Sequence, residues 1–161
     1  LLDGVAHTHV LCVVDVFTWR GYLEPPVNKK KDTVLEAHER ITERAGANPQ
    51  ILSLDKEGAT LSSDGAFEAF LDSKGTVVRR AEGVNDLAVV DGFMGRLGLE
   101  LGRIRLQKKL RMNQWAPEIA GVEAALNRKP MTTLPRNAPR DVEQAIASTD
   151  PEEVVAEFQQ L

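Results

Sequence analysis

Three aspartates stand where a mixed α/β domain could bring carboxylates together. Asp3 lies in or beside the first expected strand, Asp55 ends a buried strand, and Asp91 falls in the first turns of a long helix. Phosphodiester chemistry places negative charge on an attacking and a leaving oxygen, which two Mg²⁺ ions about 3.5 to 4 Å apart can stabilise. Mg²⁺ prefers hard oxygen ligands. The three carboxylates are therefore a candidate metal site, although with 24 acidic residues in the chain placement alone is a weak signal.

The elements that would position these acids follow from apolar patterning. Runs rich in β-branched and aliphatic residues predict strands at 10–14, 22–24, 50–54 and 76–78, and residues 1–5 could pair beside the first two. Helical spacing predicts helices at 32–46, 66–71, 86–111, 115–126, 140–147 and 151–159. Strands come first, strands and helices then alternate, and helices close the chain. This order predicts a mixed sheet flanked by helices.

The spacing of the aspartates and the phrases around them resemble the catalytic core of retroviral and retrotransposon integrases. Asp3 and Asp55 are 52 positions apart, and Asp91 follows Asp55 by 36, the distance at which that family has its Glu. Residues 11–18 (LCVVDVFT) resemble the sequence motif of the family's second strand. Residues 52–56 and 85–91 resemble the segments that carry the second and third acids. Trp115, Asn127 and residues 138–142 resemble the sequence motifs near the end of the family's core. The resemblance therefore covers nearly the whole chain.

The resemblance implies an α/β fold of the ribonuclease H-like class, with a five-stranded mixed sheet and helices on both faces. It implies one domain over residues 1–161, a catalytic core that we expect to be a fragment of a longer protein. Asp3, Asp55 and Asp91 take the catalytic and metal-ligand positions for Mg²⁺ or Mn²⁺. The implied activity is 3′-end processing and DNA strand transfer, the implied partners are DNA and further copies of the chain in a homodimer or larger homo-oligomer, and a nuclear or particle-associated location is expected for a eukaryotic element.

The chain departs from the family pattern at its acids. Asp91 replaces Glu, which shortens the side chain by one methylene and withdraws the carboxylate by roughly 1 Å, enough to lower activity unless the backbone compensates. Asp15 is an alternative candidate for the first catalytic acid, because the sequence around it resembles the family more closely than any other segment of the chain. The alternative for Asp15 is a structural acid of the second strand. Glu57 takes a position where the family has Gly, as a surrogate ligand or as a solvated side chain.

The long helix departs further. Gly92, Gly95, Gly98 and Gly102 all fall inside it, and each costs about 1 kcal/mol relative to Ala. The family commonly has basic residues at two of these positions to meet DNA phosphates. The glycines indicate either close approach of a DNA backbone or a second helix, or a tolerated surface. Four cations near the helix end are a candidate nucleic-acid patch, or else a face that complements the helix dipole: Arg103, Arg105, Lys108 and Lys109.

The composition excludes some other kinds of binding site and makes others less favourable. The net charge is −4, which counts against autonomous DNA binding without excluding a local patch. Cys12 is the single cysteine, which excludes a disulfide framework and a Cys-rich zinc site. His7, His9 and His38 have no metal-ligand spacing, so we expect no zinc. No stretch approaches the roughly 18 to 20 apolar residues of a membrane span, so we expect no membrane partner.

Three functional hypotheses remain open at this point. The first is a metal-dependent polynucleotidyl transferase core with integrase-like chemistry, an enzyme whose activity is in doubt because Asp91 replaces Glu. The second is a catalytically decayed module kept for dimerisation or scaffolding, which the glycines and the acidic net charge motivate. The third, weaker hypothesis is a nuclease of the ribonuclease H type that acts on RNA–DNA hybrids.

Overall fold

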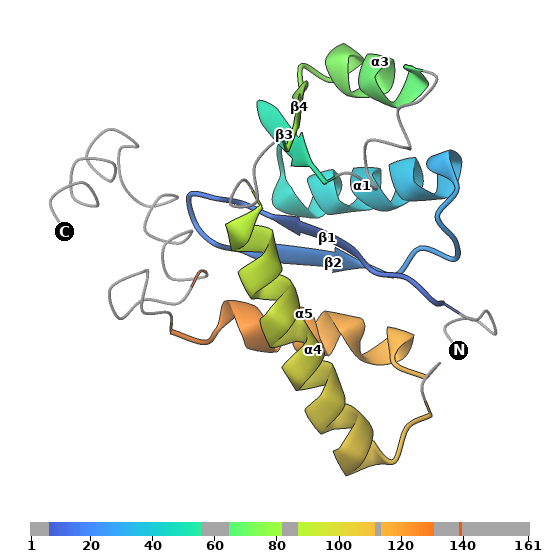
Figure 1. The fold of residues 1–161 in the computed structure, drawn as a ribbon, viewed down its shortest axis with the longest axis vertical. Helices are drawn as coiled ribbons and strands as arrows, with labels where there is room; N and C mark the ends of the chain where they lie inside the picture. Colours follow the sequence, from blue (N-terminus) through green and yellow to red (C-terminus); the bar gives the residue numbers. More distant parts are fainter. Residues whose placement is uncertain (1–6, 56–64, 82–86, 112–113, 131–138, 140–161) are drawn as a thin grey trace, which may run out of the picture.

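The computed structural model describes residues 7–55, 65–81, 87–111, 114–130 and 139 (Figure 1). Its elements are β1 (Leu11–Val14), β2 (Gly21–Glu24), α1 (Lys31–Ala45), β3 (Ile51–Leu54), α3 (Ala66–Ser73), β4 (Val77–Arg80), α4 (Ala88–Lys108), the 3₁₀ turn η1 (Ala116–Glu118) and α5 (Ile119–Asn127). The expected strand at 1–5, Asp3, Glu57 and the helices expected at 140–147 and 151–159 lie outside the described residues. The other predicted elements are confirmed to within a few residues at their ends. The strand before Asp55 is not buried as expected, because Ile51 is 53% exposed and Leu52 is the only buried residue of β3.

The four described strands form two separate pairs. β1 runs antiparallel to β2, with Leu11 opposite Glu24, and β3 runs parallel to β4, with Ile51 opposite Val77. The mixed α/β class is therefore confirmed. The expected five-stranded sheet is not present among the described residues, because β1 and β3 do not pair with each other there and the fifth expected strand, at 1–5, lies outside them.

Helix α1 packs against both strand pairs. One apolar cluster joins Val34 of α1 to Leu11 of β1 and Leu52 of β3, and it extends to Phe67 and Leu71 of α3. Both strand pairs therefore share the apolar face of one helix. Figure 1 shows α1 along one face of the β1–β2 hairpin. This common support fixes the side of the β3–β4 pair that faces the interior.

Helices α4 and α5 cover the opposite face of the hairpin (Figure 1). Successive side chains of a strand point to opposite faces, so Leu11 meets α1 while Cys12 and Val14 meet α4 and α5. The apolar stripe predicted for the long helix is confirmed, since Phe93 and Leu97 are buried in this second cluster, with Leu101 and Ile104 packed against it.

Gly21 and Phe93 make the tightest contact between α4 and the hairpin. A Cβ atom added at Gly21 would lie 2.0 Å from the Phe93 ring, a distance at which something must shift. The ring itself is fully buried. Position 21 therefore accepts only glycine while Phe93 occupies this site.

The outer edge of β2 is capped by side chains of α5. The Asn127 carboxamide accepts the Gly21 N–H at 2.9 Å and donates to the Gly21 carbonyl at 2.8 Å. One helical turn earlier, Glu123 accepts the Leu23 N–H at 2.6 Å, and Arg44 of α1 donates to the Leu23 carbonyl at 3.1 Å. Residues four apart on a helix and two apart on a strand are spaced by about 6 to 7 Å, so the two elements match. These contacts occupy backbone groups that would otherwise attract another strand.

Replacing Asn127 by Ala should lower the free energy of unfolding by about 2–4 kcal/mol, because the buried N–H and C=O of Gly21 lose their partners together. Chemical denaturation of the full chain measures this. Arg128→Ala changes the exposed next residue and should alter stability by less than about 0.5 kcal/mol. Equal, small effects from both substitutions would contradict the proposed role of the carboxamide.

Candidate active site

Asp55 directly follows the last residue of β3 and is exposed. Because β3 and β4 are parallel, their carboxyl ends lie at the same end of the pair, and the Ala81 N–H there bonds to the Leu54 carbonyl at 3.0 Å. Ligand sites in α/β folds form beyond such carboxyl ends. The position of Asp55 is therefore the one expected for a metal-ligating or catalytic acid.

Asp91 lies in the first turn of α4, the first described helix after β4, and is also exposed. Its backbone N–H donates to the Leu87 carbonyl at 2.9 Å, so the residue belongs to the regular helix. A carboxylate in a first turn is favoured by the helix dipole without any ligand. The exposure of its side chain leaves it accessible to a ligand.

Asp3 lies outside the described residues, so the structure places two of the three predicted ligands. Among the described residues, no group of three or more His, Cys, Asp or Glu side chains is placed to hold a metal ion. Asp55 and Asp91 therefore do not form a complete metal site within the described part of the chain, and a third ligand such as Asp3 would have to come from outside it.

The rival acid Asp15 has a structural role in the β1–β2 turn. Its two carboxylate oxygens accept the Phe17 N–H at 3.1 Å and the Thr18 hydroxyl at 2.6 Å. Its own N–H donates to the Arg20 carbonyl at 2.9 Å, which closes the turn. These contacts agree with the structural alternative for Asp15, since its carboxylate already holds the turn together.

Two of the four cations at the end of α4 have ion-pair partners among the described residues. Arg103 binds Glu100, and the Lys108 ammonium lies 2.6 Å from Glu118. The Arg105 Nε is buried and has no hydrogen-bond partner among the described residues, while Lys109 ends α4 with a left-handed φ of 52°. Two of the four predicted nucleic-acid residues are thus neutralised internally, which weakens the patch that they would form.

Glu100 was not singled out from the sequence, although its i,i+3 spacing to Arg103 was visible there. It is buried on α4 and also binds Lys129, whose ammonium lies 2.9 Å away, so it ties α4 to the end of α5. Hydrogen bonds from Arg103 and then Lys129 lower its pKa to about 2. The stabilisation from this carboxylate is present above its unfolded pKa near 4.5 and is lost as the pH falls toward 2.

Cys12 behaves as the apolar residue expected from the sequence. Burial, and then the nearby Glu123, raise the pKa of its thiol to about 12. The thiol therefore stays protonated and unreactive at neutral pH.

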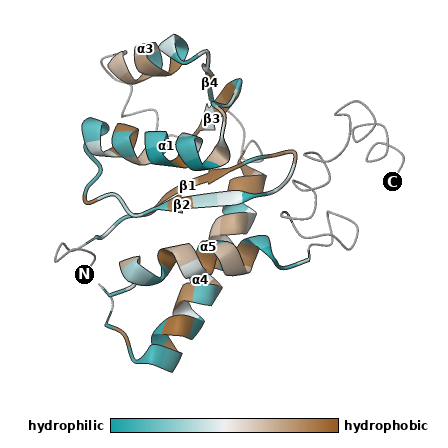
Figure 2. Cartoon of the chain, turned by 180° about the vertical axis from the view of Figure 1, so that it is seen from behind, coloured by the Kyte–Doolittle hydropathy of each residue, from teal (hydrophilic) through white to brown (hydrophobic). Residues whose placement is uncertain are grey.

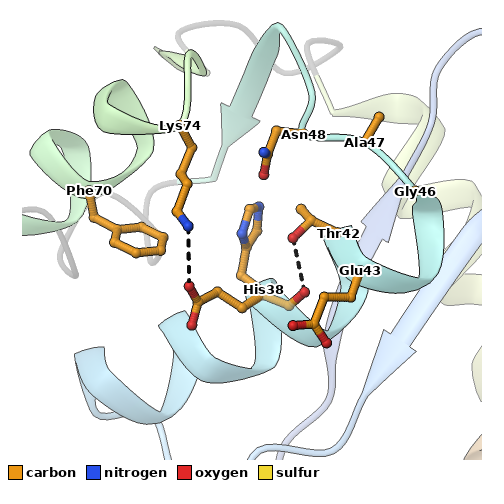
Figure 3. A pocket seen from close by; sticks show the side chains of 9 residues that line it. His38, Thr42, Glu43, Gly46, Ala47, Asn48, Phe70 and Lys74 are labelled. Atoms are coloured by element: carbon orange, nitrogen blue, oxygen red, sulfur yellow. Dashed lines mark hydrogen bonds and ion pairs between the residues drawn. The ribbon is translucent and has the colours of Figure 1, made fainter.

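A hollow of about 300 Å³ lies at the end of α1, apart from Asp55 and Asp91, neither of which lines it. Figure 3 shows the His38 imidazole rising between Lys74 and Thr42 toward Asn48. Lys74 pairs with Glu39 at 3.7 Å and lies over the Phe70 ring. His38 is buried, and its Nε2 has no hydrogen-bond partner among the described residues. Burial lowers the pKa of His38, an effect that Glu39 partly opposes.

A scan against protein-family models and a search of curated proteins gave no match to this chain. None of the helices that the structure describes is long and apolar enough to cross a membrane.

His38 should make the protein less stable as the pH falls below about 6.5. The unfolded chain takes up a proton there, whereas burial keeps the folded imidazole neutral, so the free energy of unfolding declines until the pH passes the lowered folded pKa. His38→Gln, which does not titrate, should flatten the dependence of the unfolding free energy on pH between about 6.5 and 5. Asn48→Ala, in the same hollow, should retain it. Identical pH profiles for His38→Gln and the unaltered protein would contradict this assignment.

Proposed function

We propose that the chain is the core of a metal-dependent polynucleotidyl transferase of the ribonuclease H-like class, which processes DNA 3′ ends and joins them to target DNA. The observation that carries the proposal is the placement of Asp55 and Asp91. One exposed acid directly follows a strand of the parallel pair, and the other lies in the first turn of the first described helix after that pair. Further support comes from the sequence, in which the spacing of the acids, with Asp3 as the first, and the motifs around them resemble those of integrases.

The order of the described elements supports this fold. The antiparallel hairpin β1–β2 is followed by α1, β3, α3 and β4, with β4 parallel to β3. The long helix α4, which carries Asp91, comes next. A five-stranded ribonuclease H-like sheet would have this order with one more strand before the hairpin, which is the place of the strand expected at 1–5. The packing of α1 against both strand pairs is compatible with one continuous sheet.

The donor set suits Mg²⁺ or Mn²⁺. Asp55 and Asp91 offer hard carboxylate oxygens on exposed positions, where an ion can keep some of its water ligands. Asp3, Asp55 and Asp91 would hold the ions, and the bound metal would stabilise negative charge on the attacking and leaving oxygens. The protein's own part is to present these carboxylates on two elements of a packed scaffold, open to an approaching phosphate. Asp91 reaches less far than Glu, so its position limits the rate.

A catalytically decayed module for dimerisation or scaffolding is the second candidate. The observation that favours it is the pairing of Arg103 with Glu100 and of Lys108 with Glu118, which leaves few cations on α4 to hold a DNA backbone. Under this alternative the acids at 55 and 91 are retained surface residues. A nuclease acting on RNA–DNA hybrids would use the same acids, so its substrate is what separates it from the first proposal.

The first proposal is tested with the full chain, Mn²⁺ and a library of DNA duplexes with randomised ends, whose joining to a plasmid is read by sequencing. Asp55→Asn should reduce joining by at least about 100-fold, because one metal ligand is lost and metal stabilisation of the transition state amounts to several kcal/mol. Asp72→Asn, which removes an exposed acid of α3, should leave joining unchanged.

Asp91→Glu restores the methylene that the family has and should raise joining, by up to about 100-fold if the carboxylate now stands about 1 Å short. Equal DNA joining by the unaltered protein and by Asp55→Asn would contradict the proposal. Cleavage of an RNA–DNA hybrid without any DNA joining would favour the nuclease instead.

A further inference from the structure

The hollow at the end of α1 contains a buried hydrogen-bonding atom that the described residues leave unused. His38 is 4% exposed, and its Nε2 atom has no hydrogen-bond partner among them. Leaving a buried polar atom unpaired is costly, and native structures rarely do so without a bound water, ion or ligand. The unpaired nitrogen therefore marks a position where a binding partner is expected.

The imidazole is held in the hollow by its position on α1. Figure 3 shows the ring rising from the helix, so that its far end, which carries Nε2, points toward Asn48. Asn48 is exposed, and its carboxamide has no hydrogen-bond partner in the described part of the chain. A rotation of the Asn48 side chain therefore opens the way to Nε2 without breaking a hydrogen bond. The volume of about 300 Å³ is at the lower end of the range for small-molecule sites, so the hollow fits a small ligand.

The charges around the hollow favour a cation. Figure 3 shows Glu39 and Glu43 on the rim that α1 forms, on either side of the base of His38. Lys74 pairs with Glu39 at 3.7 Å, whereas the Glu43 carboxylate has no ion-pair partner among the described residues. Figure 2 shows hydrophilic residues recurring along α1 and in its C-terminal turn, where the helix dipole is negative. An unpaired carboxylate beside a negative helix end attracts a cation and repels an anion.

The available contacts suit a guanidinium group better than an ammonium group or a metal ion. A guanidinium is planar and carries several N–H donors, so it can bind a carboxylate and an imidazole nitrogen at once. A metal ion would need more ligands, and no group of three His, Cys, Asp or Glu side chains is placed for one where the structure describes the chain. Phe70 and Ala47 also line the hollow and offer apolar surface to an alkyl chain.

We propose that this hollow binds the guanidinium group of a small organic cation. Glu43 pairs with the charge, and the His38 Nε2 accepts one N–H, as a neutral imidazole does when its proton is on Nδ1. The Asn48 carboxamide oxygen is free to accept another N–H. The binding is separate from the proposed DNA chemistry, because neither Asp55 nor Asp91 lines the hollow.

NMR titration of the full chain with butylguanidinium tests the proposal. We expect the backbone amides of residues 42–48 and the ¹⁵N signals of the His38 imidazole to shift together and to saturate. Butylammonium should bind at least about fivefold more weakly, because it presents fewer N–H donors in a less extended shape. Butyrate, an anion with a similar chain, should not bind. The absence of a saturable shift in this segment, or equal binding of butyrate, would overturn the proposal.

A tripeptide with a central arginine distinguishes the two sources of a guanidinium group. Tighter binding of the tripeptide than of butylguanidinium supports the site and assigns it to an arginine side chain of a partner protein. Weaker binding of the tripeptide supports the site and assigns it to a free small molecule. Binding of the tripeptide with no shift of the residue 42–48 amides would place the contact elsewhere and count against the hollow.

Two substitutions test the two contacts separately. Glu43→Gln removes the paired charge and should raise the dissociation constant of butylguanidinium at least about fivefold, and His38→Leu removes the acceptor and should raise it at least about tenfold. Glu36→Gln removes an exposed carboxylate of α1 that does not line the hollow, and this matched control should leave the dissociation constant unchanged. Circular dichroism checks that each variant is folded. Equal dissociation constants for Glu43→Gln and Glu36→Gln would overturn the assigned contact.

Binding should also weaken in acid. Burial lowers the pKa of His38, so the imidazole is neutral at neutral pH and gains a positive charge, which repels the ligand, as the pH falls through that lowered value. The other charged groups that line the hollow are Glu39, Glu43 and Lys74. His38→Gln keeps an acceptor that does not titrate, so it should bind butylguanidinium and lose the pH dependence between about 6.5 and 5. Retention of that dependence in His38→Gln would overturn the role of the imidazole.

Discussion

The outer edge of β2 is closed by side chains instead of another strand, and the arrangement of the described elements depends on this. Asn127 holds both backbone groups of Gly21, and Glu123 and Arg44 hold those of Leu23. The bonds from Asn127 and Glu123 of α5 to β2 join residues 106 and 100 positions apart in sequence, whereas Arg44 of α1 is 21 positions from Leu23. With the edge capped, α5 is set against the hairpin, and α5 in turn supports α4 through Lys129 and Glu100. The position of Asp91 follows from this chain of contacts.

The pKa values of the two carboxylates in this network, Glu123 and Glu100, are shifted in opposite directions. Desolvation raises the pKa of Glu123, although its bond to the Leu23 N–H and the nearby Arg44 lower it. Glu100, which receives two cationic partners, has its pKa lowered instead. The difference lies in the number of donors, since Glu100 binds two cations closely while Glu123 shares one guanidinium with Glu24. Glu123 therefore positions a strand edge at some cost in desolvation, whereas Glu100 stabilises the junction of α4 and α5 at neutral pH.

Local patterns in the sequence predicted the local structure well. The stop of α1 at Gly46 is confirmed, with a φ of 77° that glycine adopts readily and with its N–H bonded to the Thr42 and Glu43 carbonyls. The stripe of Phe93 and Leu97 is likewise confirmed. The Asn127 cap, the Lys129–Glu100 pair and the contact of Gly21 with Phe93 were not predicted. Each joins residues far apart in the chain, and propensity or spacing within one segment carries no information about such pairs. For the candidate site, the strand end at Asp55 and the helix start at Asp91 were predicted, and their convergence with Asp3 stays a prediction.

In the proposed function, Asp55 and Asp91 serve one metal site. Paramagnetic broadening of backbone amide NMR signals by trace Mn²⁺ tests it most directly, because broadening falls steeply with distance from the ion. If they do, the amides of residues 55 and 91 should broaden together at the lowest Mn²⁺ concentrations, and Asp55→Asn should remove the effect at both. Broadening at only one of them, or first around Glu39 and Glu43 beside the His38 hollow, would contradict it.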